Sequence, residues 1–257
     1  MQHPQAYAWA LVLMVALALC SLAVLVFALG MRRYPGMLTW AAGGGSLSLG
    51  VFLMLMQRSW PYALSILGAN LCLVGGGVLM AAGQRQFLGL RVPWRAFGLL
   101  LVSLACLASW FTWVRFSVPV RVLVFSVHML AVYCDLVVVA WRAYRTGSPW
   151  PALLVVGSNL VSGVFALGRG VGAISGGLDA LSSVFIWKFV AYGAFVVGPP
   201  AVVVQTAGFL LLAGYRSTCG LPPGHADQPG RMRQTCGVGE ASQTETGGQP
   251  EQQGRAG

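Results

Sequence analysis

Long apolar stretches dominate the chain, and short polar segments containing arginine separate them. A helix needs about 20 mostly apolar residues to cross the hydrocarbon core of a membrane. Seven segments reach or approach this length, although the sixth is short and Lys188 flanks the seventh. They cover residues 8–30, 37–56, 63–82, 96–114, 122–141, 151–168 and 189–214. The pattern therefore predicts an all-α integral membrane protein, with a seven-helix bundle over residues 1–214.

The last 43 residues, 215–257, differ in composition from the rest of the chain. They contain nine Gly, six Gln and four Pro, but only three large aliphatic residues. Such a segment cannot bury enough apolar area to offset the entropy that it would lose on ordering. We therefore expect a disordered C-terminal tail.

Basic residues predict how the bundle is inserted. No Lys or Arg precedes the first apolar segment, whereas Arg32 and Arg33 follow it, which is typical of an uncleaved helix with its N-terminus outside. In this orientation eleven basic residues, including those of the tail, lie on the cytoplasmic side and five lie opposite. All nine Trp lie within about four residues of a predicted helix end, where indole rings favour the membrane interface. We expect a cytoplasmic C-terminus.

Composition and charge exclude several functional classes. Hydrophobic residues make up 57% of the chain and charged residues 9%, whereas an ordinary globular domain has about 25% charged residues. The surface must therefore face something other than water, and we expect the lipid bilayer as the main partner. The net charge of +10 comes from single basic residues between apolar runs, which argues against nucleic acid. Four of the six acidic residues lie in the last 31 positions, and neither a C-x-x-C pair nor a G-x-S-x-G motif occurs. We expect no catalytic activity, no metal and no cofactor.

The fifth apolar segment contains a column of ionisable residues. His128, Asp135 and Arg142 are spaced by seven residues, so they lie on one helix face with a drift of about 20° per step. A charge within the membrane is costly and often marks a polar functional site, which makes this column a candidate for sensing protons or a ligand. In the alternative, Arg142 or a neighbouring helix neutralises Asp135 and His128 forms only local hydrogen bonds.

Two amides and a pair of prolines are the remaining candidates. Asn70 and Asn159 lie in apolar surroundings, where they either hydrogen-bond between helices or contact a ligand. Pro199 and Pro200 interrupt the seventh segment, and proline removes a backbone donor and clashes with the preceding turn. We expect a kink there, which acts either as a hinge or as simple kinked packing.

Short motifs in order along residues 8–214 resemble a known family. The motifs are Tyr34-Pro35-Gly36 with Trp40, Ser65-Ile66 with Ala69-Asn70, Gly83 with Phe87-Leu88-Gly89, Trp110-Phe111-Thr112, Arg121-Val122, Leu167-Gly168-Arg169 and Gly208-Phe209-Leu210-Leu211. They resemble the seven-helix membrane sensor regions that precede bacterial GGDEF diguanylate cyclase domains. The resemblance implies a multi-pass protein of the bacterial inner (cytoplasmic) membrane that takes part in cyclic-di-GMP signalling.

The resemblance stops at about Gly214, and the printed sequence contains no Gly-Gly-Asp-Glu-Phe motif. The composition of the tail is what out-of-frame reading of a GC-rich gene would produce, so we expect a truncated member of the family or a short standalone relative. The expected function is that of a membrane sensor or input module that acts through self-association or a separate cytoplasmic effector. The alternative is a small transporter or channel in which the column of the fifth helix lines a path.

Overall fold

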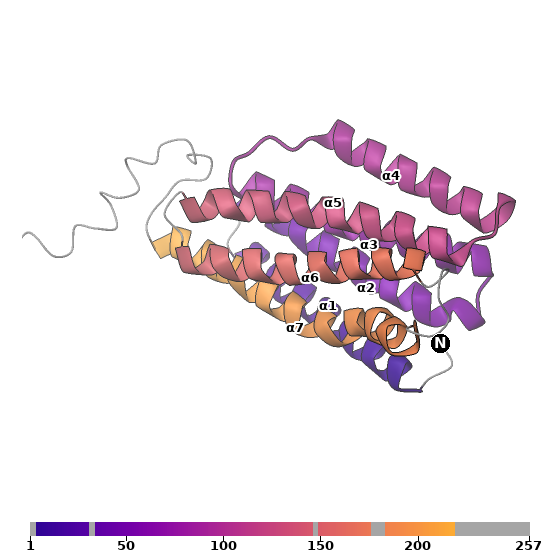
Figure 1. Cartoon of the computed structure of the whole chain (residues 1–257). Helices are drawn as coiled ribbons and strands as arrows, with labels where there is room; N and C mark the ends of the chain where they lie inside the picture. The colour runs from indigo at the N-terminus through magenta and orange to yellow at the C-terminus, as the bar shows by residue number, and fades with distance from the viewer. Residues whose placement is uncertain (1–3, 31–33, 146–148, 176–182, 219–257) are drawn as a thin grey trace, which may run out of the picture.

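A computed structural model of the chain describes residues 4–30, 34–145, 149–175 and 183–218. The tail predicted to be disordered lies almost wholly outside these residues. The described part is built from α-helices joined by short connections (Figure 1). The elements are α1 (Pro4–Gly30), α2 (Met37–Leu55), η1 (Met56–Arg58), α3 (Tyr62–Phe87), α4 (Trp94–Ser109), η2 (Trp110–Val114, a turn of π-helix), α5 (Val118–Arg145), α6 (Pro149–Ser175) and α7 (Ser183–Thr218).

Within the described residues, seven helices are long and apolar enough to cross a membrane, which confirms the predicted number. The protein is therefore a multi-pass membrane protein. The predicted ends were too short for α3 and α6, which continue to Phe87 and Ser175 rather than to residues 82 and 168. Both apolar runs end near an arginine that has a partner in the bundle, Asp135 for Arg85 and the Phe125 ring for Arg169.

Six of the helices form a closed ring. Going round it, α1 packs on α2, α2 on α3, α3 on α5, α5 on α6, α6 on α7, and α7 again on α1. The remaining helix, α4, lies outside the ring against α3 and α5, and it forms the upper edge of the molecule in Figure 1. The interior of the ring is therefore lined by every transmembrane helix except α4.

The α2–α3 contact depends on glycines that let the two backbones approach closely. A Cβ atom built on Gly43 would lie 2.6 Å from the Gly76 carbonyl oxygen, and one on Gly76 would lie 2.6 Å from the Gly43 oxygen. One end of the same seam is formed by Gly83 and by Gly36, whose φ of 90° favours glycine. Small residues thus bring these two helices together within one chain, as they do in other membrane helix pairs.

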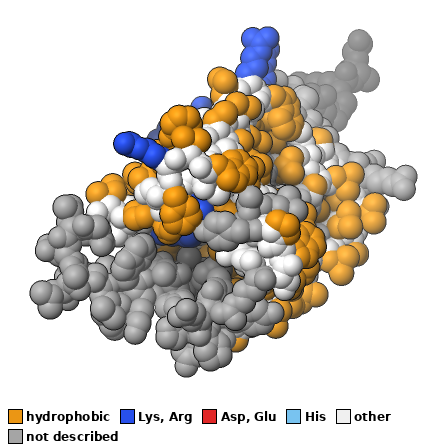
Figure 2. All heavy atoms as spheres, turned by 90° about the vertical axis from the view of Figure 1, so that its right-hand side faces the viewer, with side chains coloured by type: hydrophobic (Ala, Val, Ile, Leu, Met, Phe, Trp, Pro, Cys, Tyr) orange, Lys and Arg blue, Asp and Glu red, His pale blue; other side chains and the backbone are white. Residues whose placement is uncertain are grey.

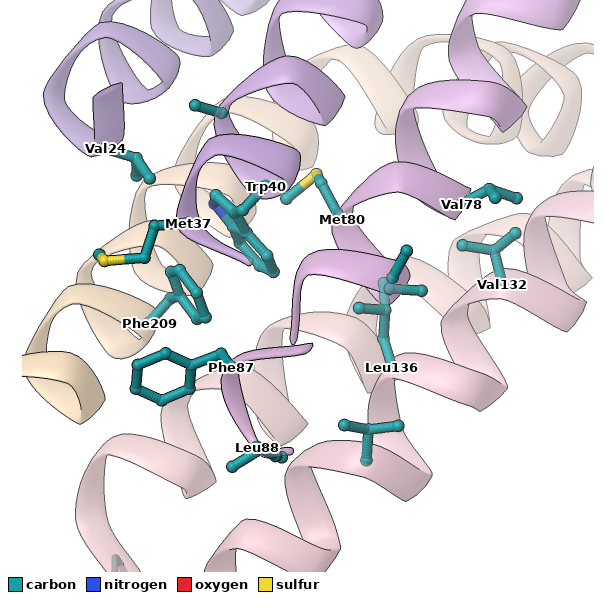
Figure 3. Packing of buried hydrophobic residues seen from close by; sticks show 14 of the residues in the cluster. Val24, Met37, Trp40, Val78, Met80, Phe87, Leu88, Val132, Leu136 and Phe209 are labelled. Carbon is teal, nitrogen blue, oxygen red and sulfur yellow. The ribbon is translucent and has the colours of Figure 1, made fainter. Parts of the chain in front are cut away.

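One end of the ring is filled by a close-packed aromatic core (Figure 3). The rings of Trp40 on α2 and Phe209 on α7 are stacked, with centroids 4.2 Å apart. Phe87 at the end of α3 meets the edge of Phe209 at 5.2 Å. All three side chains are buried, and this core joins the start of α2 to the ends of α3 and α7.

The outer surface of the described bundle is apolar. Figure 2 shows the end of the bundle that holds the start of α1, and orange hydrophobic side chains cover most of the described surface there. Leu99 on α4 and Val164 on α6 are more than three-fifths exposed, and Trp150 is 79% exposed. Such a surface is unfavourable in water and suits contact with lipid chains.

Candidate functional site

The structure places His128 at the contact between α5 and α4. Its Nδ1 lies 2.7 Å from the Val124 carbonyl oxygen, and its Nε2 lies 2.9 Å from Ser103 Oγ. The Ser103 hydroxyl also lies 2.9 Å from the Leu100 oxygen. With a neutral imidazole the hydroxyl donates to Nε2, and with a protonated one Nε2 donates to the hydroxyl, which then donates to Leu100. The contact is therefore compatible with both protonation states.

Asp135 pairs with a neighbouring helix rather than with Arg142. Arg85 on α3 donates from Nε to Asp135 Oδ2 at 3.0 Å, and its Nη2 forms a second bond to Oδ1. Nη1 of the same guanidinium reaches the Arg91 carbonyl oxygen at 3.3 Å. Arg142 is exposed two turns further along α5. Of the two partners left open by the sequence, the structure therefore selects the neighbouring helix.

The two predicted amides have different surroundings. Asn159 on α6 is buried, donates to the Val155 carbonyl oxygen at 2.7 Å, and accepts a hydrogen bond from Gln205 Nε2 on α7 at 3.2 Å. It thus links two helices through a residue that the sequence had not singled out. Asn70 is half-buried on α3, and its side chain has no hydrogen bond to any other described residue.

The two prolines lie within an unbroken helix. α7 runs from Ser183 to Thr218 through Pro199, which is buried, and Pro200, which is exposed. The expected hinge at this position stays a prediction.

A cavity of about 170 Å³ lies inside the ring, at the end away from the aromatic core. All six ring helices line it. Most of its wall is apolar, and the apolar lining includes Leu13, Leu17, Leu47, Val51, Met54, Leu73, Met80, Phe125, Met129, Leu136, Phe165 and Val202. Neither His128 nor Asp135 belongs to the lining.

Five polar side chains of the described part of the chain face this cavity, and four of them form two short columns. Ser126 and Tyr133 are seven residues apart on α5, and Ser162 and Arg169 are seven apart on α6. Gln205 on α7 is the fifth. The Tyr133 hydroxyl hydrogen-bonds the Ser162 side chain, whose Oγ also donates to the Ser158 carbonyl oxygen at 2.9 Å. The polar groups therefore cluster where α5, α6 and α7 meet.

Among the described residues, Arg169 is the only charged group in the cavity wall. Its guanidinium carbon lies 5.3 Å above the centre of the Phe125 ring, close enough for a cation–π interaction. Tyr133 is near enough to interact with it electrostatically. Asp135 is the only acidic residue within the described ranges, and it pairs with Arg85. Within those ranges, Arg169 therefore has no carboxylate partner.

The sequence carries a spacing signal for this site beside the charged column. Ser126 and Tyr133 have the same seven-residue spacing as His128 and Asp135, and the two columns lie two residues apart. Two residues correspond to about 200° round a helix, so the columns face nearly opposite sides of α5. Of the two columns, only the charged one was predicted as a candidate site, and Arg169 lies one residue past the predicted end of the sixth apolar segment at 168.

The described lining of the cavity combines one charged group with neutral polar and apolar side chains. Small-molecule sites in proteins have a similar composition, with a mostly apolar wall and a few polar groups. Among the residues that the structure describes, no three His, Cys, Asp or Glu side chains come together as metal ligands would. Comparison of the chain with protein-family models, curated proteins and solved structures finds no match.

Proposed function

We propose that this protein is a membrane-embedded sensor module, in which occupancy of the ring cavity changes the packing of α7. One observation carries the proposal. Gln205 on α7 lines the cavity, and Phe209, one helical turn further on, stacks on Trp40 in the aromatic core. A single turn of helix is stiff and the core is close-packed, so a shift of α7 at the cavity requires the core to rearrange.

The proposal includes the direction of the signal. With the N-terminus outside, the cavity lies towards the outer side and the aromatic core towards the cytoplasm. The arginines that follow α1 and α3 support this orientation, because basic residues concentrate on the cytoplasmic side. The end of α7 would then pass the change to a separate cytoplasmic effector or to a second copy of the chain, in the inner membrane of a bacterium. The resemblance to the sensor regions of diguanylate cyclases is the reason for proposing this class of output.

Transport is the second candidate, and the positions of the polar residues favour it less. His128 and Asp135 point to α4 and α3 and do not line the ring cavity, so the polar column of α5 and this cavity do not form one path. Proton flux into vesicles that contain the purified protein separates the two ideas. Flux that Asp135→Asn abolishes would favour a transporter over a sensor.

A cavity-filling variant tests the sensor proposal without any ligand. Ala166 lines the cavity, and Ala166→Leu adds apolar volume inside it. Ala131 on α5 is exposed on the outer surface, so Ala131→Leu is the matched control with the same chemical change. We expect Ala166→Leu, and not Ala131→Leu, to change amide hydrogen exchange over residues 206–215 of the protein in nanodiscs. Identical exchange in the two variants over this segment would overturn the proposal.

A further inference from the structure

We propose that the ring cavity binds a small monocarboxylate with an apolar body, and that the carboxylate pairs with Arg169. This inference rests on the proposed function, because it names the ligand class of the same cavity. It starts from the position of Arg169, five residues before the end of the apolar span Trp150–Ile174 and thus about 8 Å inside that end.

The surroundings of Arg169 favour an anion. Within the described ranges the guanidinium has an aromatic ring and a phenol beside it but no carboxylate. A guanidinium presents a planar fork of donors that matches the two oxygens of a carboxylate. The low-dielectric surroundings strengthen such a pair compared with the same pair in water. The apolar span would otherwise hold a charge that Phe125 and Tyr133 compensate only in part.

Ser126 provides a second and independent indication. It lines the cavity, is 3% exposed, and its Oγ has no hydrogen-bond partner among the described residues. A buried hydroxyl without a partner is costly, so its position in a cavity wall suggests that a ligand supplies the missing bond. Ser126 also lies next to the α6 turn that holds Arg169, because a Cβ atom on Gly170 would lie 3.4 Å from Ser126 Cβ. Both groups can therefore meet the same ligand head.

Size and charge narrow the ligand class. A cavity of about 150 Å³ is large enough for a benzene molecule, so the 170 Å³ here holds a body of about that size. The apolar wall suits such a body. One guanidinium balances one negative charge, which favours a monocarboxylate over a dianion such as phosphate. The neutral donors of Ser162 and Gln205 are left for any further polar atom of the ligand.

Benzoate is a suitable probe, with benzamide as its neutral counterpart. Binding of each is measured by isothermal titration calorimetry on the full chain in phosphatidylcholine nanodiscs, which contain no anionic lipid. We expect Arg169→Gln to weaken benzoate binding about tenfold or more, as expected for loss of a charged hydrogen bond. Arg142→Gln removes the same charge from an exposed position outside the cavity and is expected to leave the affinity unchanged. Ser126→Ala is expected to weaken binding several-fold.

Three results of the benzoate and benzamide titrations would overturn the proposal. They are equal binding of benzoate to the native chain and to Arg169→Gln, tighter binding of benzamide than of benzoate, and no binding of benzoate at all. Arg169→Lys keeps the charge if Arg169→Gln fails to fold, and it is expected to retain measurable benzoate binding. Competition by added phosphatidylglycerol would identify a lipid headgroup as the occupant and would also overturn the proposal.

The ligand class and the sensor function can fail separately. If benzoate fails but Ala166→Leu still alters exchange in α7, the sensor proposal stands and the ligand belongs to another class. If benzoate binds through Arg169 but Ala166→Leu does not alter exchange in α7, the site stands and the transmission fails.

Discussion

The α2–α3 seam allows a sharp test of the fold, because three consecutive glycines on α2 have different surroundings. A Cβ on Gly43 would lie 2.6 Å from the Gly76 oxygen and 2.8 Å from the Met80 backbone nitrogen, whereas a Cβ on Gly45 would meet nothing within 4 Å. An ordinary C···O contact is about 3.3–3.6 Å, so Gly43→Ala must move the helices apart by about 0.7–1.0 Å. Overpacking of this kind costs about 1–3 kcal/mol.

Gly45→Ala is the matched control for this variant. Both substitutions raise helix propensity by about 0.5–1 kcal/mol, and this gain cancels when the two variants are compared. Gly43→Ala is therefore expected to unfold with a free energy about 1–3 kcal/mol below that of Gly45→Ala. The measurement is an equilibrium titration of SDS into dodecylmaltoside micelles, followed by tryptophan fluorescence. Free energies of unfolding that agree within about 0.5 kcal/mol would refute the close approach of α2 and α3.

Two polar contacts give further predictions in the same unfolding assay. Asp135→Asn leaves Arg85 without its ion-pair partner and is expected to lower the free energy of unfolding by about 2–3 kcal/mol. This loss is smaller than that for a fully buried pair because both side chains are about one-fifth exposed. Arg142→Gln is its control and is expected to stay within about 0.5 kcal/mol of the native chain, so an equal loss in both variants would contradict the pairing. Ser103→Ala removes the α4 partner of His128 and is expected to cost about 0.6 kcal/mol, as interhelical hydrogen bonds in membranes do on average. An unchanged free energy of unfolding for Ser103→Ala would show that this contact does not hold α4 to the ring.

Helix number and approximate position could be predicted from the sequence because the membrane sets a minimum length for each apolar run. Helix ends were harder to predict, because a charged residue ends an apolar run without ending the helix. Arg85 lies beyond the predicted end of α3 but belongs to the helix, and its charge is balanced by Asp135 on α5. The position of α4 outside the ring was also beyond prediction, because the apolar run of α4 resembles those of the ring helices.

The candidate site was only partly visible in the sequence. Residue spacing placed His128 and Asp135 on one face of α5, but it gave no indication of which helix that face meets. The cavity is lined by uncharged residues such as Ser126 and by an arginine at the edge of an apolar run. Serines are common in membrane helices, and only three-dimensional packing distinguishes one that faces a cavity from one that bonds to its own backbone.

The contacts that hold α7 differ in strength between the two ends of the ring. Near the core, Phe209 is stacked on Trp40 and cannot move without losing dense aromatic contact. At the cavity, α7 is joined to α6 by the hydrogen bond from Gln205 to Asn159, which is worth only about 0.6 kcal/mol if it is typical of membrane helices. A ligand that offers Gln205 a better acceptor can therefore break this bond at small cost. The differential affinity needed to bias two packings of α7 is a few kcal/mol. It has to come from contacts that the ligand makes with α7 itself, such as one with Gln205, because Arg169 lies on α6 and anchors the ligand in either packing.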